Sequence, residues 1–490
     1  MRHDQYIEAV SCWRPVWDEH EETSRCFWHA DINDKTGEEL RIHRVDGPER
    51  LDGAILRGTE TNTPVSFVEC GLIGATFEGV ALPGADFGRA ALTRTQFPAA
   101  DLRRAEFPDA NLMNAEFPDA NLRRAEFPDA NLMNAEFPDA DLWNAKFPDA
   151  NLMNAEFPIA KLRNARFLNA YLLSANFHNA DLRYAKFLNA HIRSVDFTDS
   201  NLLGADLSDA NASRAVFRHA NLQDTVLADT DCRYATFTST LLYETVFKDT
   251  RINSQTTFFD RESTFYDSSE SLSRISRIGQ SVKSALGRGS SFASRPTCVY
   301  EENPGTESKE KVPKSESLPD GVNRFAASRW VYRRLEALHE ENALSEEARD
   351  YHISKEEAER KLLKERGDPR RHVKTLMWAL SKHGESVKRL LAWWVGVIVL
   401  AGLTFPFVGG VKEPDGTTHA IASLGELGTW AGVSDVLLNV YFSVITFSTI
   451  GYGDLSPASA WSRVLVAGES LVGAILVALL VFVLGRRVAR

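Results

Sequence analysis

Near the end of the chain, residues 449–454 read Thr-Ile-Gly-Tyr-Gly-Asp, and glycine alternates there with larger residues. Glycine adopts left-handed backbone angles without steric cost, so Gly451 and Gly453 would let successive backbone carbonyls face one axis. A row of carbonyl oxygens can replace the water around a dehydrated cation. The segment therefore predicts a site that binds cations through backbone oxygens rather than a catalytic centre.

Two long apolar segments flank this motif and must position it. Residues 390–408 contain no charge, and residues 464–484 contain one acidic residue, Glu469. At about 1.5 Å per residue, each segment is long enough as a helix to cross the hydrocarbon core of a bilayer. Between them, residues 435–448 are apolar but shorter, so we expect a re-entrant helix that leads into the motif. Basic residues flank the outer ends of both spans, which predicts a multi-pass protein of the cell membrane with both termini in the cytoplasm.

In this setting the motif resembles the selectivity filter of potassium channels, TVGYGD, with Ile in place of Val. The resemblance covers roughly residues 390–485 and implies a two-transmembrane-helix pore with a re-entrant pore loop. It implies that backbone carbonyls and the Thr449 hydroxyl bind K+, that Tyr452 braces the strand, and that Asp454 closes the outer mouth. Each chain offers one strand, so four copies would surround the pore as a homotetramer. The implied filter residues are Thr449, Ile450, Gly451, Tyr452, Gly453 and Asp454.

The segment before the filter departs from the family's pattern. Tyr441 and Phe442 stand where family members often carry two tryptophans, and Ile445 stands where some carry a glutamate. We therefore expect softer support for the filter, with Asp454 lacking the glutamate as its partner.

The second span holds two further candidates. Gly473 occupies the position of the family's inner-helix hinge, although a glycine in a span can equally serve close helix packing. Glu469 is an ionisable residue in a span, which is usually functional, and we expect it to hydrogen-bond behind the pore helix. The alternative is a position at the lipid level. No helix carries arginine at every third position, so no voltage sensor is expected.

A weaker cluster near the N-terminus contains Cys12, His20, Cys26 and His29. Two cysteines and two histidines could hold zinc, but their spacing matches no standard finger. Packing around neighbouring tryptophans would explain the same residues. Beyond this candidate Zn2+ site, no cofactor is expected, and K+ enters only as the permeant ion.

From about Phe67 to Ile252, a bulky apolar residue recurs every five positions, usually with a small residue two places before it. A period of five fits neither an α-helix nor a flat strand. It fits a coil with four sides of five residues each. Leu and Phe alternate, so like residues should stack every twenty positions into two Phe ladders and two Leu ladders.

This segment resembles the pentapeptide-repeat family, whose pattern A-[DN]-L-x-x is met by residues 110–112 and 120–122, among others. The resemblance implies a right-handed quadrilateral β-helix. On its surface, Arg103, Arg123 and Arg163 fall on one face, interrupted by Trp143. Methionines fall on the opposite face, at Met113, Met133 and Met153. These columns are either a solvated surface or a docking stripe for a protein partner.

Composition divides the remaining chain. Residues 1–50 form a small N-terminal region with the candidate metal site, and residues 51–260 the β-helix. Residues 261–320 are rich in Ser, Gly, Pro and charge and predict a disordered linker. Residues 321–389 predict cytoplasmic helices, the last of them amphipathic, and residues 390–490 the pore domain.

The 490 residues carry a formal net charge of -11, which argues against a nucleic-acid partner. The odd number of cysteines indicates a reducing compartment, and residues 1–10 lack the apolar stretch of a signal peptide. No catalytic pairing or phosphate-binding loop stands out, so an enzyme is not expected. The sequence therefore predicts a potassium-selective channel in a lipid bilayer, with a regulatory or scaffolding repeat domain. The alternative is a membrane-anchored scaffold with a vestigial pore.

Overall fold

The computed structural model describes residues 26–258, apart from 34, 45–46 and 62, and residues 322–488, apart from 422–428 and 449–452. The predicted linker 261–320 lies outside the described residues. The chain divides into two compact units, Met1–Lys355 and Glu356–Arg490.

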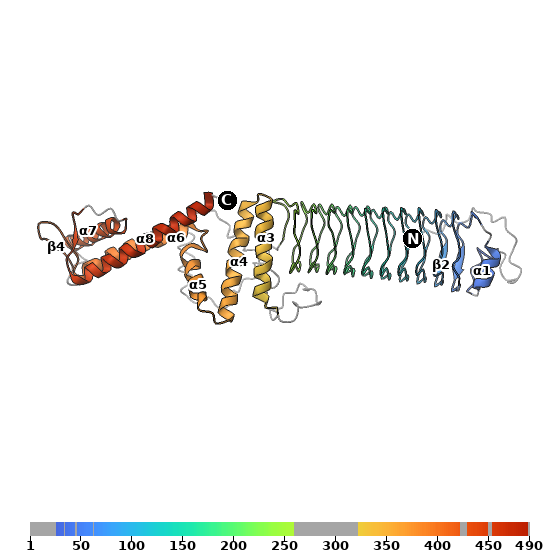
Figure 1. Cartoon of the computed structure of the whole chain (residues 1–490), viewed down its shortest axis with the longest axis horizontal. Helices are drawn as coiled ribbons and strands as arrows, with labels where there is room; N and C mark the ends of the chain where they lie inside the picture. Colours follow the sequence, from blue (N-terminus) through green and yellow to red (C-terminus); the bar gives the residue numbers. More distant parts are fainter. Residues whose placement is uncertain are drawn as a thin grey trace. The chain divides into compact units, whose positions relative to one another are not determined.

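The first unit is built around a stack of coils (Figure 1). Parallel bridges join each strand position to the residue twenty places later, as in Asp101↔Asn121 and Glu106↔Glu126. Four such bridges fall within one coil, so each coil has four sides. The first coils carry one extra residue, because β1 (Ile55–Arg57) pairs with β2 (Thr76–Glu78) at an offset of one more place. The pattern of five is therefore a four-sided β-helix.

Phenylalanine rings form two continuous stacks inside the coils. Phe97 lies over Phe117 with ring centroids 4.8 Å apart, and Phe107 lies over Phe127 at 4.7 Å. The two stacks meet edge to face across the interior, as between Phe107 and Phe117 at 6.4 Å. Leu102 and Leu122 occupy the alternate sides and are fully buried. The predicted ladders are thus confirmed.

The coil corners depend on a backbone conformation that the sequence analysis did not foresee. The second turn residue of nearly every repeat has a positive φ, such as Asp109 at 56° and Asn114 at 56°. Asn and Asp tolerate this left-handed region better than other side chains, which explains their frequency there. The side-chain oxygen of the strand residue two places before the turn often accepts a backbone N–H, as Asp101 accepts from Arg103.

Separate elements close the two ends of the stack. At the N-terminal end, α1 (Gly37–His43) follows a loop whose Trp28 is buried and lies edge-on to Phe67, at 6.5 Å. At the C-terminal end lie α3 (Arg324–Glu341) and the start of α4 (Ser345–Glu365).

The residue that ends α3 completes the last coil. The side-chain amide of Asn342 accepts a hydrogen bond from the Ile252 N–H at 2.9 Å and donates one to the Thr250 carbonyl at 2.9 Å. Beside it, His339 lies against the Phe258 ring at 5.4 Å, and Trp330 lies against Tyr243 at 5.6 Å. The helix thus satisfies strand edges that would otherwise be open.

The second unit holds the apolar helices. After α5 (Arg370–Ser381) come α6 (Val387–Thr404), the short helix η2 (Phe405–Val408), α7 (Trp430–Phe447) and α8 (Ala460–Val488). Among the described residues, three helices are long and apolar enough to cross a membrane: Val387–Val408, Trp430–Phe447 and Ala460–Gly485. The first and third contain the predicted segments 390–408 and 464–484, and the second contains all of the predicted segment 435–448 except its last residue.

The middle helix is longer than predicted. It begins at Trp430 instead of residue 435, because the Thr429 hydroxyl caps it by accepting the Gly432 N–H. With 18 residues, α7 is long enough to cross a membrane, so its length does not exclude a full crossing. The path of the chain at its two ends must decide that question.

Candidate ion-conduction site

A small three-stranded sheet gathers the ends of the three apolar helices. Its order is β4–β3–β5, formed by Thr418–His419, Val411–Lys412 and Ser456–Pro457. β3 follows the end of α6, β4 precedes α7, and β5 precedes α8. The Ser459 hydroxyl adds a bond to the Val408 carbonyl at 2.5 Å. The end of α6 and the start of α8 are therefore held together.

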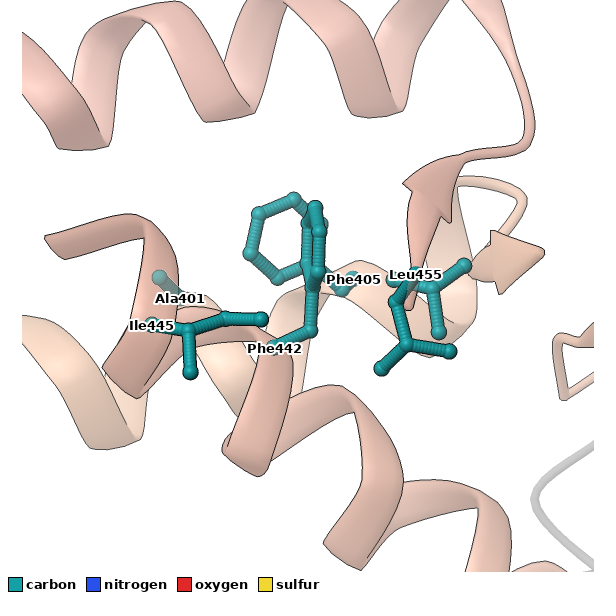
Figure 2. Packing of buried hydrophobic residues seen from close by; sticks show 6 residues of the cluster. Ala401, Phe405, Phe442, Ile445 and Leu455 are labelled. Carbon is teal, nitrogen blue, oxygen red and sulfur yellow. The ribbon is translucent and has the colours of Figure 1, made fainter. Parts of the chain in front are cut away.

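The middle helix packs closely against α6. A Cβ atom at Gly402 would lie 2.7 Å from the Val440 Cα, so only glycine permits this approach. Nearby, Phe442 lies edge-on to Phe405 at 5.3 Å. Figure 2 shows these rings together with Ile445 and Leu455, all of them buried. Phe442 and Ile445 thus belong to an apolar cluster that holds α7 against α6.

The filter segment itself is only partly described. Residues 449–452, which contain the predicted ion-binding carbonyls, lie outside the described residues. Gly453 has a φ of 75°, in the region that glycine favours. The Tyr441 hydroxyl donates a hydrogen bond to Asp454 Oδ2 at 2.9 Å. Asp454 therefore has a tyrosine as partner in place of the family's glutamate, and the tyrosine reaches it from one turn before Ile445.

Polar contacts join the three helices near the end of α7. Ser443 of α7 contacts Glu469 of α8, and its hydroxyl also lies 2.8 Å from the Ile398 carbonyl of α6. Glu469 is 4% exposed. The carboxyl group of Glu469 therefore lies buried against α7.

Gly473 lies where α8 meets the end of α7. A Cβ atom there would lie 2.9 Å from the Phe447 carbonyl oxygen. The helix Ala460–Val488 is continuous through this position. Close packing alone accounts for the glycine, and its role as a hinge stays a prediction.

The sequence analysis did not predict one set of contacts at the start of α7. His419 Nδ1 lies 2.8 Å from Asp435 Oδ1 of α7, and its Nε2 lies 3.4 Å from Glu413 Oε1. Its backbone carbonyl accepts a hydrogen bond from the Asn439 side chain at 2.9 Å. These contacts tie β4 to the first half of α7. Asp435 and Asn439 share one helix face, which is the only sequence cue to them.

The candidate zinc ligands are only half described. Cys12 and His20 lie outside the described residues. Cys26 Sγ lies 3.1 Å from His29 Nδ1, and His29 Nε2 lies 2.9 Å from the Asp52 carbonyl. Within the described residues, no group of three or more potential ligands could hold a metal. Zinc binding stays a prediction.

Comparison with protein families matches both parts of the chain. Residues 416–490 match a family model described as an ion channel. Residues 130–207 match a pentapeptide repeat region, and residues 70–107, 190–229 and 205–243 match pentapeptide repeats. The search of curated proteins gave no match.

Solved pentapeptide-repeat structures resemble the first part of the chain. HetL of the cyanobacterium Nostoc sp. strain PCC 7120, described as involved in heterocyst differentiation regulation, is 26% identical with a TM-score of 0.34, covering 42% of this chain and 86% of its own. Rfr23 of the cyanobacterium Cyanothece 51142 is 30% identical with a TM-score of 0.18, covering 19% of this chain, which spans only 62% of that protein. QnrB1, described as a plasmid-mediated fluoroquinolone resistance protein, is 18% identical with a TM-score of 0.23, covering 42% of this chain and 93% of its own.

The repeats, the four-sided coils, the apolar helices and the family matches agree with one another. The chain joins a region of pentapeptide repeats to a C-terminal ion-channel domain.

Proposed function

We propose that four copies of this chain form a potassium-selective channel in the cell membrane, with the repeat domain as a regulatory or scaffolding part. The observation that carries the proposal is the three-stranded sheet beside α7. It fixes where the chain enters and leaves the segment that contains the motif.

β4 precedes α7 and β5 follows the motif, and both pair with β3. The chain therefore leaves this sheet, runs down α7, passes residues 449–454 and returns to the same sheet. An 18-residue helix is about 27 Å long, and the eight or so residues that follow it can span a similar length when extended. The contact between Tyr441 and Asp454 supports a return path alongside the helix. α7 is thus a re-entrant helix, and α6 and α8 are the two membrane spans.

This arrangement would serve cation passage in the way that the motif suggests. A helix and an extended return segment bring the backbone of residues 449–453 toward one axis when copies surround it. Carbonyl oxygens then replace the hydration shell of K+. Both long spans begin and end on opposite sides, so the N-terminal helices and the end of α8 lie on one side. The basic residues before α6 favour the cytoplasm for that side.

The isolated chain favours assembly with further copies. Large apolar residues of α7 and α8 are exposed, among them Leu437 at 64% and Leu471 at 65%. Only 17% of the apolar 18-residue stretch of α8 is buried inside the chain. Lipid and neighbouring copies together would cover these faces. One strand of filter per chain accounts for four copies.

Ion flux tests the proposal directly. Full-length protein in liposomes should pass K+ and exclude Na+. Replacing Gly451 by Ala should abolish this selectivity or all flux, because alanine resists left-handed backbone angles. The matched control is Gly396→Ala, since a Cβ atom at Gly396 of α6 meets nothing within 4 Å. Tetramers that pass no ion under any condition would instead favour a membrane-anchored scaffold with a vestigial pore.

A further inference from the structure

One corner of the coil stack differs from the other three in charge. We define the arginine corner as the turn pairs 103–104, 123–124, 143–144, 163–164 and 183–184, which follow one another at twenty-residue intervals. Its arginines are exposed except for the half-buried last one. They are Arg103, Arg104, Arg123, Arg124, Arg163 and Arg183. No acidic residue occupies these turn pairs.

The two neighbouring corners are acidic beside the first coils of this line, up to residue 149, and neutral beyond it. Their second turn residues are Asp119 and Asp139 on one side, and Asp109, Asp129 and Asp149 on the other. The diagonal corner is neutral over the same stretch, with Met and Asn in its turn pairs at 113–114, 133–134 and 153–154. Positive charge on the corners is therefore concentrated in one narrow line between two negative ones.

Part of this positive charge is neutralised locally. Arg103 pairs with Asp101 at 2.7 Å, Arg123 with Asp141 at 3.5 Å, and Arg183 with Asp181 at 2.6 Å. In the part of the chain that the structure describes, the guanidinium groups of Arg104 and Arg124 have no acidic partner. These two residues lie one coil apart, which is about 4.8 Å. Their mutual repulsion favours a partner that brings negative charge.

Aromatic rings lie within the same line. The Trp143 ring is half-buried, with Arg123 4.6 Å and Arg124 5.9 Å from its centroid. Further along, Arg163 lies 5.5 Å from the centroid of the exposed Tyr184 ring. Tryptophan, tyrosine and arginine are the residues that most often dominate the binding energy of protein interfaces.

We propose that the arginine corner binds an acidic α-helix of a partner protein, laid along the coil stack. A helix advances about 5.4 Å per turn, close to the coil spacing of about 4.8 Å. Glutamates three or four positions apart would therefore meet successive arginines over the four coil steps of the corner, and the flexible side chains absorb the small mismatch. The Asp-bearing corners on both sides favour a partner helix with basic residues flanking its acidic line.

Duplex DNA fits this surface less well. The phosphates of a duplex wind around its axis and leave a straight line of arginines within a few base pairs. A duplex is also wide enough to meet the acidic corners, and the chain as a whole carries a net charge of -11. A polyanion of that width would be repelled where a single helix is not.

This inference rests on the scaffolding role in the proposed function and not on ion conduction. The test uses full-length protein in detergent and a fluorescent, alanine-based helical peptide of about 16 residues with glutamates along one face. A second peptide has the same composition with glutamates spread around the helix. The third probe is a short DNA duplex. Binding is followed by fluorescence anisotropy at low and high salt.

The decisive variant is Arg104→Gln with Arg124→Gln. Both residues have a positive φ, and glutamine bears it no worse than arginine, so the coils should stay folded. The matched control is Arg193→Gln with Arg218→Gln, which removes the same charge from two exposed turn positions on other corners.

The one-face peptide should bind the wild-type protein and the control variant equally, and the decisive variant about tenfold more weakly. Equal binding of both peptides would overturn the helical partner, and tighter binding of DNA would overturn the choice of a protein. Unchanged binding by the decisive variant would overturn the site. K+ flux measured on the same preparations separates these outcomes from failure of the channel, because loss of flux with intact peptide binding rejects conduction alone.

Discussion

The coil stack and the channel domain bury their apolar residues in different ways. In the stack, each Phe and Leu of the central coils is fully buried by the coils above and below it, all from one chain. In the channel domain, α7 and α8 expose large apolar residues, such as Leu437 and Leu471. The first region is complete as a single chain, whereas the second leaves surfaces that lipid and further copies would cover. In the coil stack, successive repeats of one chain cover each other's apolar residues. In the channel domain, symmetry-related copies of the chain would cover them.

The largest effect on this comparison should come from a cavity in the coil stack. Phe137 lies 4.8 Å from both Phe117 and Phe157 and edge-on to Phe127. Replacing it by Ala should cost about 4 kcal/mol of stability, because the rigid coils above and below cannot collapse into the space. Urea unfolding followed by circular dichroism measures this, with the exposed Glu106→Ala as control. A loss below about 1 kcal/mol would mean that the coils do not depend on their neighbours for packing.

The helical cap at the end of the stack should respond to acid. Burial alone would raise the pKa of Glu336, but hydrogen bonds from His352 at 2.8 Å and from Lys355, with their charges, outweigh it and lower the pKa to about 2. The pKa of an unfolded glutamate is about 4.3, so the stabilisation is complete above that value and is lost as the pH falls toward about 2.

Glu336→Gln should therefore destabilise α3 and α4 by about 3 kcal/mol at neutral pH, because the half-buried Lys355 ammonium loses its carboxylate partner. Hydrogen exchange of the α3 amides measures the loss, and the exposed Glu341→Gln of the same helix serves as control. A variant that exchanges like the wild type at neutral pH would show that the ion pairs contribute nothing.

The junction between α3 and the last coil should weaken when Asn342 is replaced by Ala. Two hydrogen bonds to Ile252 and Thr250 are lost, each worth about 1 kcal/mol, so the Ile252 amide should exchange roughly thirtyfold faster. Asn342→Asp keeps the acceptor for the Ile252 N–H and loses the donor, and it should show a smaller effect. Equal exchange in all three proteins would mean that the coil ends without help from the helix.

The smallest expected effect is a gain in the stability of the coil stack. Ile159 occupies a corner position with a φ of 61°, which a β-branched residue tolerates poorly. Ile159→Asn should stabilise the coils by about 1 kcal/mol, and the reverse change Asn154→Ile at the equivalent position of the preceding repeat should destabilise them similarly. A higher urea midpoint for the first variant and a lower one for the second are the expected readings. Opposite shifts would contradict the role given to the corners.

The coil stack could be predicted almost in full from sequence, because equivalent residues of successive coils have the same environment. The spacing of Phe and Leu alone gave four sides and like-on-like stacking, which the ring contacts confirm. The left-handed corners were not foreseen, although Asp and Asn at the same position of successive repeats carried that signal. The end caps could not be predicted, since Trp28 and Asn342 act through contacts between distant parts of the chain.

The channel domain was predictable in its apolar segments and less so in its details. The start of α7 depends on the Thr429 cap. The apolar pattern alone predicts a start at residue 435 and leaves the first residues of the helix in a loop. The partner of Asp454 depends on a tyrosine thirteen positions earlier that replaces the family's tryptophan. The sheet that joins the helix ends has strands of only two residues, too short to leave a pattern.

The most direct test of the account is the reversal potential of full-length protein in a planar bilayer with K+ on one side and Na+ on the other. Carbonyl oxygens of residues 449–452 from four chains predict a reversal potential far from zero, with the K+ side negative, because K+ leaves that side much faster than Na+ enters it. A reversal potential near zero in this arrangement, with intact tetramers, would contradict the central claim.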